Sequence, residues 1–218
     1  KNPLFGLQNF MSNLPTSEKS GSDTEWAAAL STTRRMQTLI NDVVRILRET
    51  DGSMAYELSV PELAQMISSK LQQRAREAGV EFLVRESASG HLTNRDANLI
   101  LLILENLVSN AIEATPSGKS VSLTIHRVKE KIVCEVRDQG AGFPTELRPH
   151  LFSPCRSTKE GGSGIGLAIS KQLAHHLGAS LELRSSSPEG SVFELSLPDS
   201  LFDSGAISST STPLSAKS

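Results

Sequence analysis

Apolar residues follow a helical period near the start of this chain and a mixed pattern after it. Between residues 24 and 49 they recur every three or four positions, with charged residues between them, which predicts one long amphipathic helix. Residues 1–14 show similar spacing and predict the end of an earlier helix, joined through a Ser-, Gly- and Thr-rich loop. Such a hairpin leaves an apolar stripe uncovered, so we expect residues 1–52 to pair with a second copy as a four-helix bundle.

From about residue 55 the pattern predicts a mixed α and β domain that ends near residue 198. Helices are predicted at residues 61–78, 94–114 and 164–177, with a short one within 144–151. Strands are predicted at residues 80–85, 120–128, 131–136, 181–184 and 191–197. We therefore expect an α+β fold, a two-layer α/β sandwich in which a mixed, mostly antiparallel sheet has helices on one face. Residues 199–218 are rich in Ser and Thr and predict a flexible tail.

Composition narrows the classes of partner. A net charge of −2 and a pI near 6.2 give no general attraction to nucleic acid or to an anionic membrane, so neither is expected as a partner. Two cysteines do not make a disulfide scaffold and favour a reducing compartment. The longest apolar run, residues 99–104, is far below the roughly 20 residues of a membrane helix. Because the chain begins at Lys1, we expect a fragment of a longer cytoplasmic protein, whose membrane anchor, if it has one, lies elsewhere.

The predicted helix at residues 94–114 carries polar side chains away from its apolar stripe. Asn106, Asn110 and Glu113 are spaced i, i+4 and i+7, so we expect them to share one face. Amide oxygens suit a hydrated Mg²⁺ held against a triphosphate. A surface asparagine is the simpler interpretation of any one of them, and the helix alone leaves both interpretations open.

A second motif, Asp138-Gln139-Gly140-Ala141-Gly142, follows directly on a predicted strand. A carboxylate at a strand end can accept a hydrogen bond from the exocyclic amine of adenine. Glycines two positions apart let the backbone turn sharply and approach a base closely. Taken alone, this pattern is a turn.

The third motif is the glycine-rich run Gly161-Gly162-Ser163-Gly164-Ile165-Gly166-Leu167 at the start of a predicted helix. Backbone N–H groups at such a helix start can bind phosphate oxygens. The run lacks the Lys-Ser/Thr ending of a Walker A loop, and no parallel βαβ pattern surrounds it as in a Rossmann fold. Lys159, just upstream, is the candidate phosphate cation, although a solvated loop lysine is an equal interpretation.

In this order the three motifs resemble the N, G1 and G2 boxes of the ATP-binding domain shared by sensor histidine kinases, gyrase, the Hsp90 chaperones and MutL. Residues 151–159 resemble the kinase F box, and residues 190–195 resemble the terminal strand behind the adenine. Residues 1–4 resemble the end of the kinase H box. The chain thus looks like the C-terminal portion of a sensor histidine kinase, with a partial phosphoacceptor hairpin (1–52) and a catalytic domain (55–198).

The resemblance implies a protein-histidine kinase with ATP and Mg²⁺ as cofactors. It implies a nucleotide site formed by Asn106, Asn110, Asp138, Gly140, Gly142, Lys159, Gly162, Gly164, Ile165, Gly166, Leu167 and Ser191. Within that set Asn110 would bind Mg²⁺ through the phosphates, Asp138 the adenine amine, and Ser191 the adenine through water.

The resemblance also implies the route of the phosphate. The acceptor histidine would precede Lys1, so no catalytic residue lies in the fragment and it should not phosphorylate itself. The γ-phosphate would pass to that histidine and then to an aspartate on a response regulator receiver domain. The partners implied are that receiver domain and a second copy of the chain, bound through the hairpin.

Two other functions use the same kind of motifs. A clamp ATPase of the gyrase or chaperone type needs a carboxylate base one helical turn before the metal-binding Asn110, where this chain has Asn106; Glu105 projects about 100° away on an ideal helix. A nucleotide-binding but inactive dimeric scaffold or phosphatase module stays open. Glu113 also departs from the resemblance, since many kinases have a basic residue there, and that departure gives Lys159 more weight.

Overall fold

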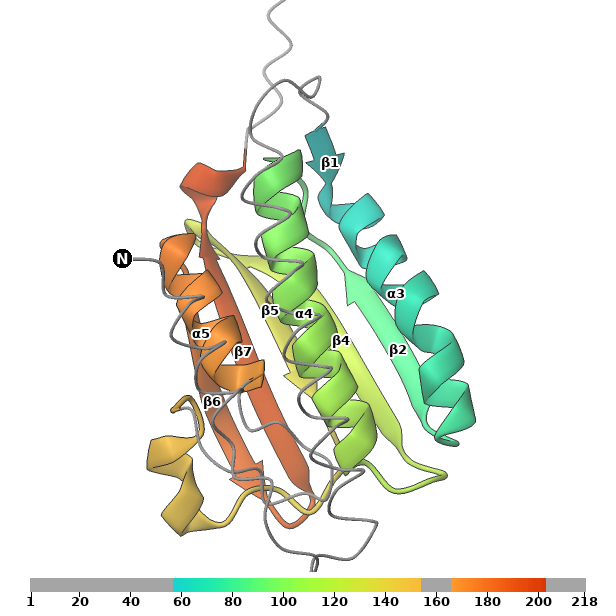
Figure 1. Ribbon diagram of the computed structural model, residues 1–218. Helices are drawn as coiled ribbons and strands as arrows, with labels where there is room; N and C mark the ends of the chain where they lie inside the picture. The colour runs from blue at the N-terminus through green and yellow to red at the C-terminus, as the bar shows by residue number, and fades with distance from the viewer. Residues whose placement is uncertain (1–56, 154–165, 203–218) are drawn as a thin grey trace, which may run out of the picture.

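The computed structural model describes residues 57–153 and 166–202. The predicted hairpin (1–52), the glycine-rich segment before residue 166 and most of the predicted tail lie outside the described residues. What is described is a two-layer sandwich, with three helices on one face of a single large sheet (Figure 1).

The large sheet has five strands in the order β2-β4-β5-β7-β6. Their bounds are Glu81–Glu86 (β2), Ser120–Val128 (β4), Lys131–Arg137 (β5), Ser180–Ser187 (β6) and Gly190–Pro198 (β7). Only β2 and β4 pair in parallel, and the other three pairs are antiparallel. The prediction of a mixed, mostly antiparallel sheet with helices on one face is therefore confirmed.

The helices begin and end where local sequence signals place them. They are α3 (Val60–Glu77), α4 (Asn94–Ala114) and α5 (Gly166–His176). Ser59 and Glu62 form a reciprocal capping box at α3, and these hydrogen bonds from Ser59 lower the pKa of Glu62. At α4 the Thr93 side chain accepts from the backbone N–H of Asp96 at 3.2 Å, the hydrogen bond of an N-cap residue.

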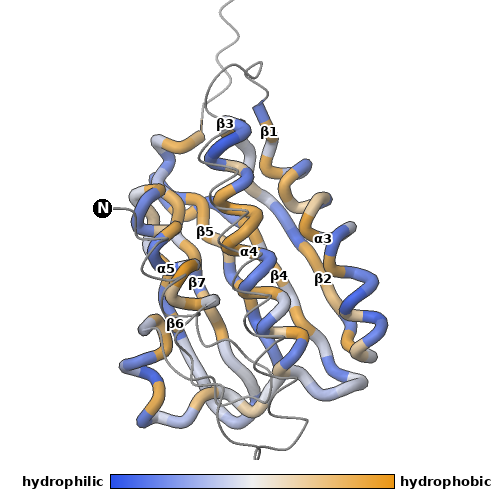
Figure 2. The backbone as a smooth tube through the Cα atoms, in the orientation of Figure 1, coloured by the Kyte–Doolittle hydropathy of each residue, from blue (hydrophilic) through white to orange (hydrophobic). Residues whose placement is uncertain are grey.

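α4 is the central helix of the sandwich. By length and composition it could cross a membrane, but 72% of its most apolar stretch is buried inside the domain. Its neighbours are α3, α5 and the strands behind it, and Figure 2 shows apolar stretches along both layers. α4 is apolar on most sides because helices pack on both of its flanks and the sheet packs behind it. It is therefore a core helix of the domain.

Smaller elements complete the domain, and the sequence pattern did not predict all of them. Strands β1 (Glu57–Ser59) and β3 (His91–Thr93) form a separate antiparallel ribbon. The 3-10 helix η1 (Thr145–His150) falls where a short helix was predicted. β6 is longer than predicted, because its exposed serines carry no alternating apolar signal.

The packed structure continues beyond Pro198. A 3-10 turn, η2 (Asp199–Leu201), leads to Phe202, which is buried and contacts Gly90. Arg127 forms an ion pair with Asp199. Gly90 also accepts a hydrogen bond from the backbone N–H of Val60 at 3.1 Å, so one loop holds both ends of the described domain.

Candidate functional site

Asp138 lies at the end of β5 with its carboxylate buried, only 6% exposed. Its Oδ1 accepts hydrogen bonds from the backbone N–H groups of Gly140 at 2.8 Å and Ser191 at 3.1 Å. The Asp138 N–H donates in turn to the Ser191 carbonyl at 3.0 Å. Two backbone N–H groups therefore fix the carboxyl group between its own turn and the start of β7.

Three glycines allow the backbone to close around this carboxylate. A Cβ on Gly140 would lie 2.5 Å from the Ala114 carbonyl oxygen, and one on Gly142 would lie 2.2 Å from that of Ser187. Gly142 also has a φ of +72°. Gly190, with a φ of +144°, would bring a Cβ to 2.0 Å from the Asp138 carbonyl oxygen. Sequence reasoning proposed the first two as site residues and missed Gly190, although it directly precedes Ser191.

The Ser191 side chain is 2% exposed and lies beside Asp138. Its Oγ is 3.3 Å from Oγ of Ser186 on β6. Ser186 Oγ also accepts from the backbone N–H of Phe143 at 2.7 Å, on the far side of the glycine turn. Ser186 was not predicted, because a serine among neighbouring serines gives no distinguishing signal.

The outer side of the same turn is tied to β4. The side-chain oxygen of Gln139 accepts from the Ser120 backbone N–H at 2.9 Å and from its hydroxyl at 3.2 Å. Lys119 Nζ donates to the Gln139 carbonyl at 3.2 Å. The turn is thus held from β4, β6 and β7 at once, which is a preorganised arrangement for a carboxylate that recognises a ligand.

Asn106 on α4 contacts α5. Its Nδ2 donates to Ser170 Oγ at 2.9 Å, and both side chains are buried. A Cβ on Gly166 would lie 2.5 Å from Asn106 Oδ1, so the first residue of α5 packs directly on the amide. Asn106 therefore fixes the position of the helix that follows the glycine-rich segment.

Glu113 lies on the same stripe of α4 as the two asparagines, but its carboxylate contacts a different neighbour. Glu113 Oε1 is 2.5 Å from Nη2 of Arg74 on α3, whereas Asn106 bonds to α5 and Asn110 is partly buried. Long side chains on one helical stripe reach different neighbours, which spacing cannot show. Glu105 is also turned to α3, where its Oε1 is 2.5 Å from Lys70 Nζ.

The predicted residues that the structure describes gather at one end of the sandwich, where β5 ends and α5 begins (Figure 1). This group contains Asn106, Asn110, Asp138, Gly140, Gly142, Gly166, Leu167 and Ser191. Leu167 is partly buried against the core. Lys159, Gly162, Gly164 and Ile165 lie outside the described residues. Within residues 57–153 and 166–202, no three His, Cys, Asp or Glu side chains are placed to hold a metal.

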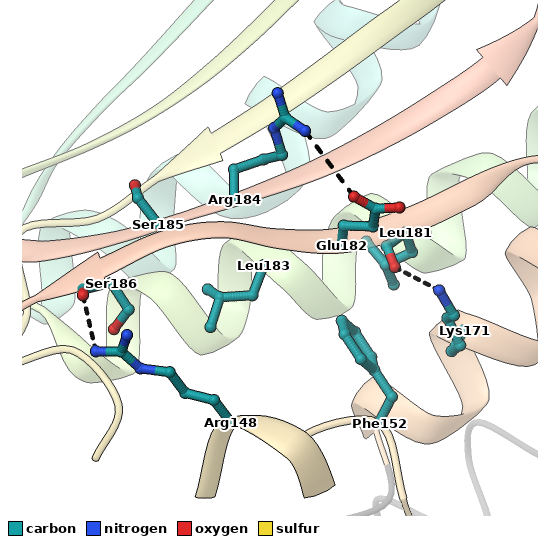
Figure 3. Close-up of a pocket in the computed structure, with 9 residues that line it drawn as sticks. All are labelled: Arg148, Phe152, Lys171, Leu181, Glu182, Leu183, Arg184, Ser185 and Ser186. Atoms are coloured by element: carbon teal, nitrogen blue, oxygen red, sulfur yellow. Dashed lines mark hydrogen bonds and ion pairs between the residues drawn. The ribbon is translucent and has the colours of Figure 1, made fainter. Parts of the chain in front are cut away.

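A separate open cavity of about 340 Å³ lies along the free edge of β6 (Figure 3). Lys171 Nζ donates to the Leu181 carbonyl at 2.7 Å and lies over the Phe152 ring, while Arg148 Nη2 donates to the Ser186 carbonyl at 2.9 Å. The two cationic side chains thus donate hydrogen bonds to backbone carbonyls of β6 that would otherwise be unpaired at the edge of the sheet.

The two-layer sandwich and the position of Asp138 at the end of β5 agree with the arrangement expected for an ATP-binding domain of the gyrase and histidine kinase type. Family comparison agrees, since the model of histidine kinase-, DNA gyrase B- and HSP90-like ATPases matches residues 95–201. This region belongs to that family, whose members in histidine kinases bind ATP.

Relatives place the chain among sensor kinases. It is 30% identical over 175 residues to the signal transduction histidine-protein kinase AfsQ2 of Streptomyces coelicolor, covering 78% of this chain and 32% of that protein. It is 32% identical over 173 residues to the sensor histidine kinase MtrB of Mycobacterium tuberculosis, covering 75% and 30%. The chain is a catalytic portion of the sensor histidine kinase kind, and it spans about a third of the length of these relatives.

Solved structures agree. The catalytic domain of histidine kinase ThkA is similar with a TM-score of 0.60 and 26% identity, over 67% of this chain and 97% of that one. The same kinase in complex with response regulator protein TrrA gives a TM-score of 0.58 over 91% of this chain and 58% of that one; at 22% identity this shows the fold alone.

Proposed function

We propose that this chain is the ATP-binding core of a two-component sensor kinase that transfers the γ-phosphate of ATP to a histidine outside residues 1–218. The observation that carries the proposal is the buried Asp138 carboxylate, held by two backbone N–H groups at one end of the sandwich. A fixed buried acceptor of this kind recognises an amine donor, and adenine supplies one. The family match supports ATP as the complete ligand, with its ribose and phosphates bound in the same site.

Each site residue then has a distinct role. Asp138 accepts from the adenine amine, and Ser191 presents its hydroxyl to the neighbouring ring nitrogen directly or through one water. Asn106 holds the start of α5, where the backbone N–H groups of Gly166 and Leu167 are suited to a phosphate. Gly162, Gly164 and Ile165 would shape the phosphate loop, and Lys159 would meet the phosphate charge.

Mg²⁺ fits the residues present. Asn110 lies on α4 one helical turn after Asn106, and its amide oxygen would be the ligand, while the nearby carboxylates of Glu105 and Glu113 are paired with Lys70 and Arg74. A single neutral oxygen ligand suits an ion that takes its other ligands from water and phosphate. When bound, Mg²⁺ would neutralise phosphate charge, and Asn110 would orient it.

The paired glutamates also argue against a clamp ATPase. Hydrolysis of that type needs a carboxylate that can take a proton from water. The closest candidate in sequence, Glu105, faces Lys70 on α3 instead. We therefore assign phosphotransfer rather than hydrolysis, with positioning and charge neutralisation as the main contributions.

The partners follow from this assignment. The phosphorylated histidine would pass its phosphate to the receiver domain of a response regulator, and residues 1–52 would pair two copies of the chain. We place the site in the cytoplasm, where ATP and response regulators are found.

Calorimetric titration with ADP and a non-hydrolysable ATP analogue, with and without Mg²⁺, tests the nucleotide site. We expect micromolar to millimolar affinity. A second assay supplies in trans a hairpin that carries the acceptor histidine and measures acid-labile phosphate. Failure of the unaltered chain to bind either nucleotide would contradict the proposal.

A further inference from the structure

The hydroxyl group of Ser186 lies beside the turn that holds Asp138, and no proposed ligand contact accounts for it. Ser186 lies on β6, outside the three motifs, and its Oγ stands between Phe143 and Ser191. Resting on the proposed function, we infer that Ser186 sets the direction of the Ser191 hydroxyl and so makes it a hydrogen-bond donor toward the adenine ring. Ser186 is then a positioning residue for base specificity.

The direction follows from counting protons. A serine hydroxyl has one proton and can accept as well as donate. Ser186 Oγ accepts from the Phe143 backbone N–H at 2.7 Å, a group that can only donate. Among the described residues, Ser191 Oγ at 3.3 Å is the only acceptor in hydrogen-bond contact with Ser186 Oγ. Either hydroxyl can be the donor in this contact. Because Ser186 Oγ already accepts from Phe143, we take Ser186 as the donor, which leaves the proton of Ser191 to point onward.

The direction matters because of what lies beside Ser191. Its backbone N–H donates to Asp138 Oδ1, so the serine hydroxyl and the carboxylate are neighbours. Together they present one donor and one acceptor side by side. Adenine offers the complement, an acceptor at N1 and a donor at the 6-amine. Guanine offers the reverse, an acceptor at O6 and a donor at N1, and a site with fixed polar groups rejects such a mismatch strongly.

The position of Ser186 is itself braced. Arg148 on η1 donates through Nη2 to the Ser186 carbonyl at 2.9 Å (Figure 3). Its Nε donates to the Phe143 carbonyl at 3.2 Å. The Arg148 guanidinium thus holds both Phe143 and Ser186, the two residues joined by the hydrogen bond from the Phe143 N–H to Ser186 Oγ. Gly142 leaves room for this contact, since a Cβ there would lie 2.8 Å from Ser186 Oγ.

The test compares ADP with 1-deaza-ADP, which lacks the N1 acceptor, by calorimetry on the full chain. For the unaltered chain we expect 1-deaza-ADP to bind about 5- to 10-fold more weakly, the usual size of one net hydrogen bond. In Ser186→Ala the direction of the Ser191 proton is no longer set. ADP should then weaken about fivefold while 1-deaza-ADP hardly changes, so the two affinities come within about twofold.

Matched variants separate positioning from general damage. Ser185→Ala removes an exposed hydroxyl from the adjacent residue and should behave as the unaltered chain. Ser186→Thr keeps the hydroxyl and should keep the full preference for ADP. Equal weakening of both nucleotides in Ser186→Ala, or an unchanged preference, overturns the inference. If that variant does not fold, Ser186→Cys replaces it: a weaker donor should reduce the preference, and a full preference overturns the inference.

The outcomes also separate the inference from the function beneath it. An unaltered chain that binds no ADP contradicts the proposed nucleotide site itself. An unaltered chain that binds ADP and 1-deaza-ADP equally overturns only the inference about the serine pair, because the site then makes no use of N1.

Discussion

Asp138→Asn tests the centre of the site with the smallest change in shape. Asparagine keeps a carbonyl oxygen that can accept from the Gly140 and Ser191 N–H groups, at 2.8 and 3.1 Å in the structure. Its amide nitrogen takes the place of the second carboxylate oxygen and faces the adenine amine, so two donors meet. A hydrogen bond to a charged group contributes about 1.5–3 kcal/mol, which predicts a loss of about 10- to 150-fold in ADP affinity.

Calorimetry with ADP and with IDP measures this loss and its cause. IDP carries an oxygen in place of the amine, so the asparagine variant should lose little affinity for IDP or gain some. Asp199→Asn, the same change in the Arg127 ion pair at the other end of the domain, should leave both affinities unchanged. ADP affinity in Asp138→Asn within twofold of the unaltered chain would refute the assignment of this carboxylate to the adenine amine.

Stability measurements complete this prediction. Asp138→Ala removes both acceptors and leaves two N–H groups unpaired in a buried turn, at about 1–3 kcal/mol each. We expect thermal denaturation to show Asp138→Ala well below Asp138→Asn. Equal loss in the two variants would mean that the carboxylate holds the turn through its charge alone.

Four further predictions concern residues around this turn and in the core. Asn110→Ala should remove the Mg²⁺ dependence of ATP-analogue binding while leaving ADP binding without Mg²⁺ intact; an unchanged metal dependence would contradict its role. Ser170→Ala should lower the free energy of unfolding by about 1–3 kcal/mol in denaturant titration, because it orphans a buried amide N–H on α4. Gly190→Ala should destabilise the domain far more than Gly118→Ala, since both have positive φ but only Gly190 is crowded. Burial raises the pKa of the Cys134 thiol from 9.0 to about 12, so in a Cys155→Ser background it should react with iodoacetamide only on unfolding; its contribution to stability, complete below pH 9, should be lost as the pH rises toward 12.

The helices and central strands could be predicted because their signals are local. Thr93 and Asp96 mark the start of α4, and the alternation in β4 and β5 gives their bounds to within a residue. The short ribbon of β1 and β3 could not be predicted, because three-residue strands have no measurable period and their pairing joins residues over 30 positions apart.

In the candidate site, too, residues with a local sequence signal could be predicted, whereas residues that matter only through tertiary contacts could not. The motifs located Asp138 and its glycines, because a carboxylate and glycines after a strand have a chemical meaning before any fold is known. They did not locate Ser186, Ser170 or Gly190 as site residues. Each of these matters only through a neighbour that the fold brings to it: Ser191 for Ser186, Asn106 for Ser170 and the Asp138 carbonyl for Gly190.

The loop at Gly90 contacts both Val60 and Phe202, so it links the first and last elements of the described domain. Both ends of the described domain lie beside Gly90, next to β1 and η2. β5 ends, and α5 begins, at the opposite end of the sandwich (Figure 1). If the domain rotated about the end beside Gly90, the end that carries the Asp138 turn would move the farthest. Because α4 has 21 residues and is about 30 Å long, a small rotation at one end of the domain would displace the other end by the rotation angle multiplied by that length.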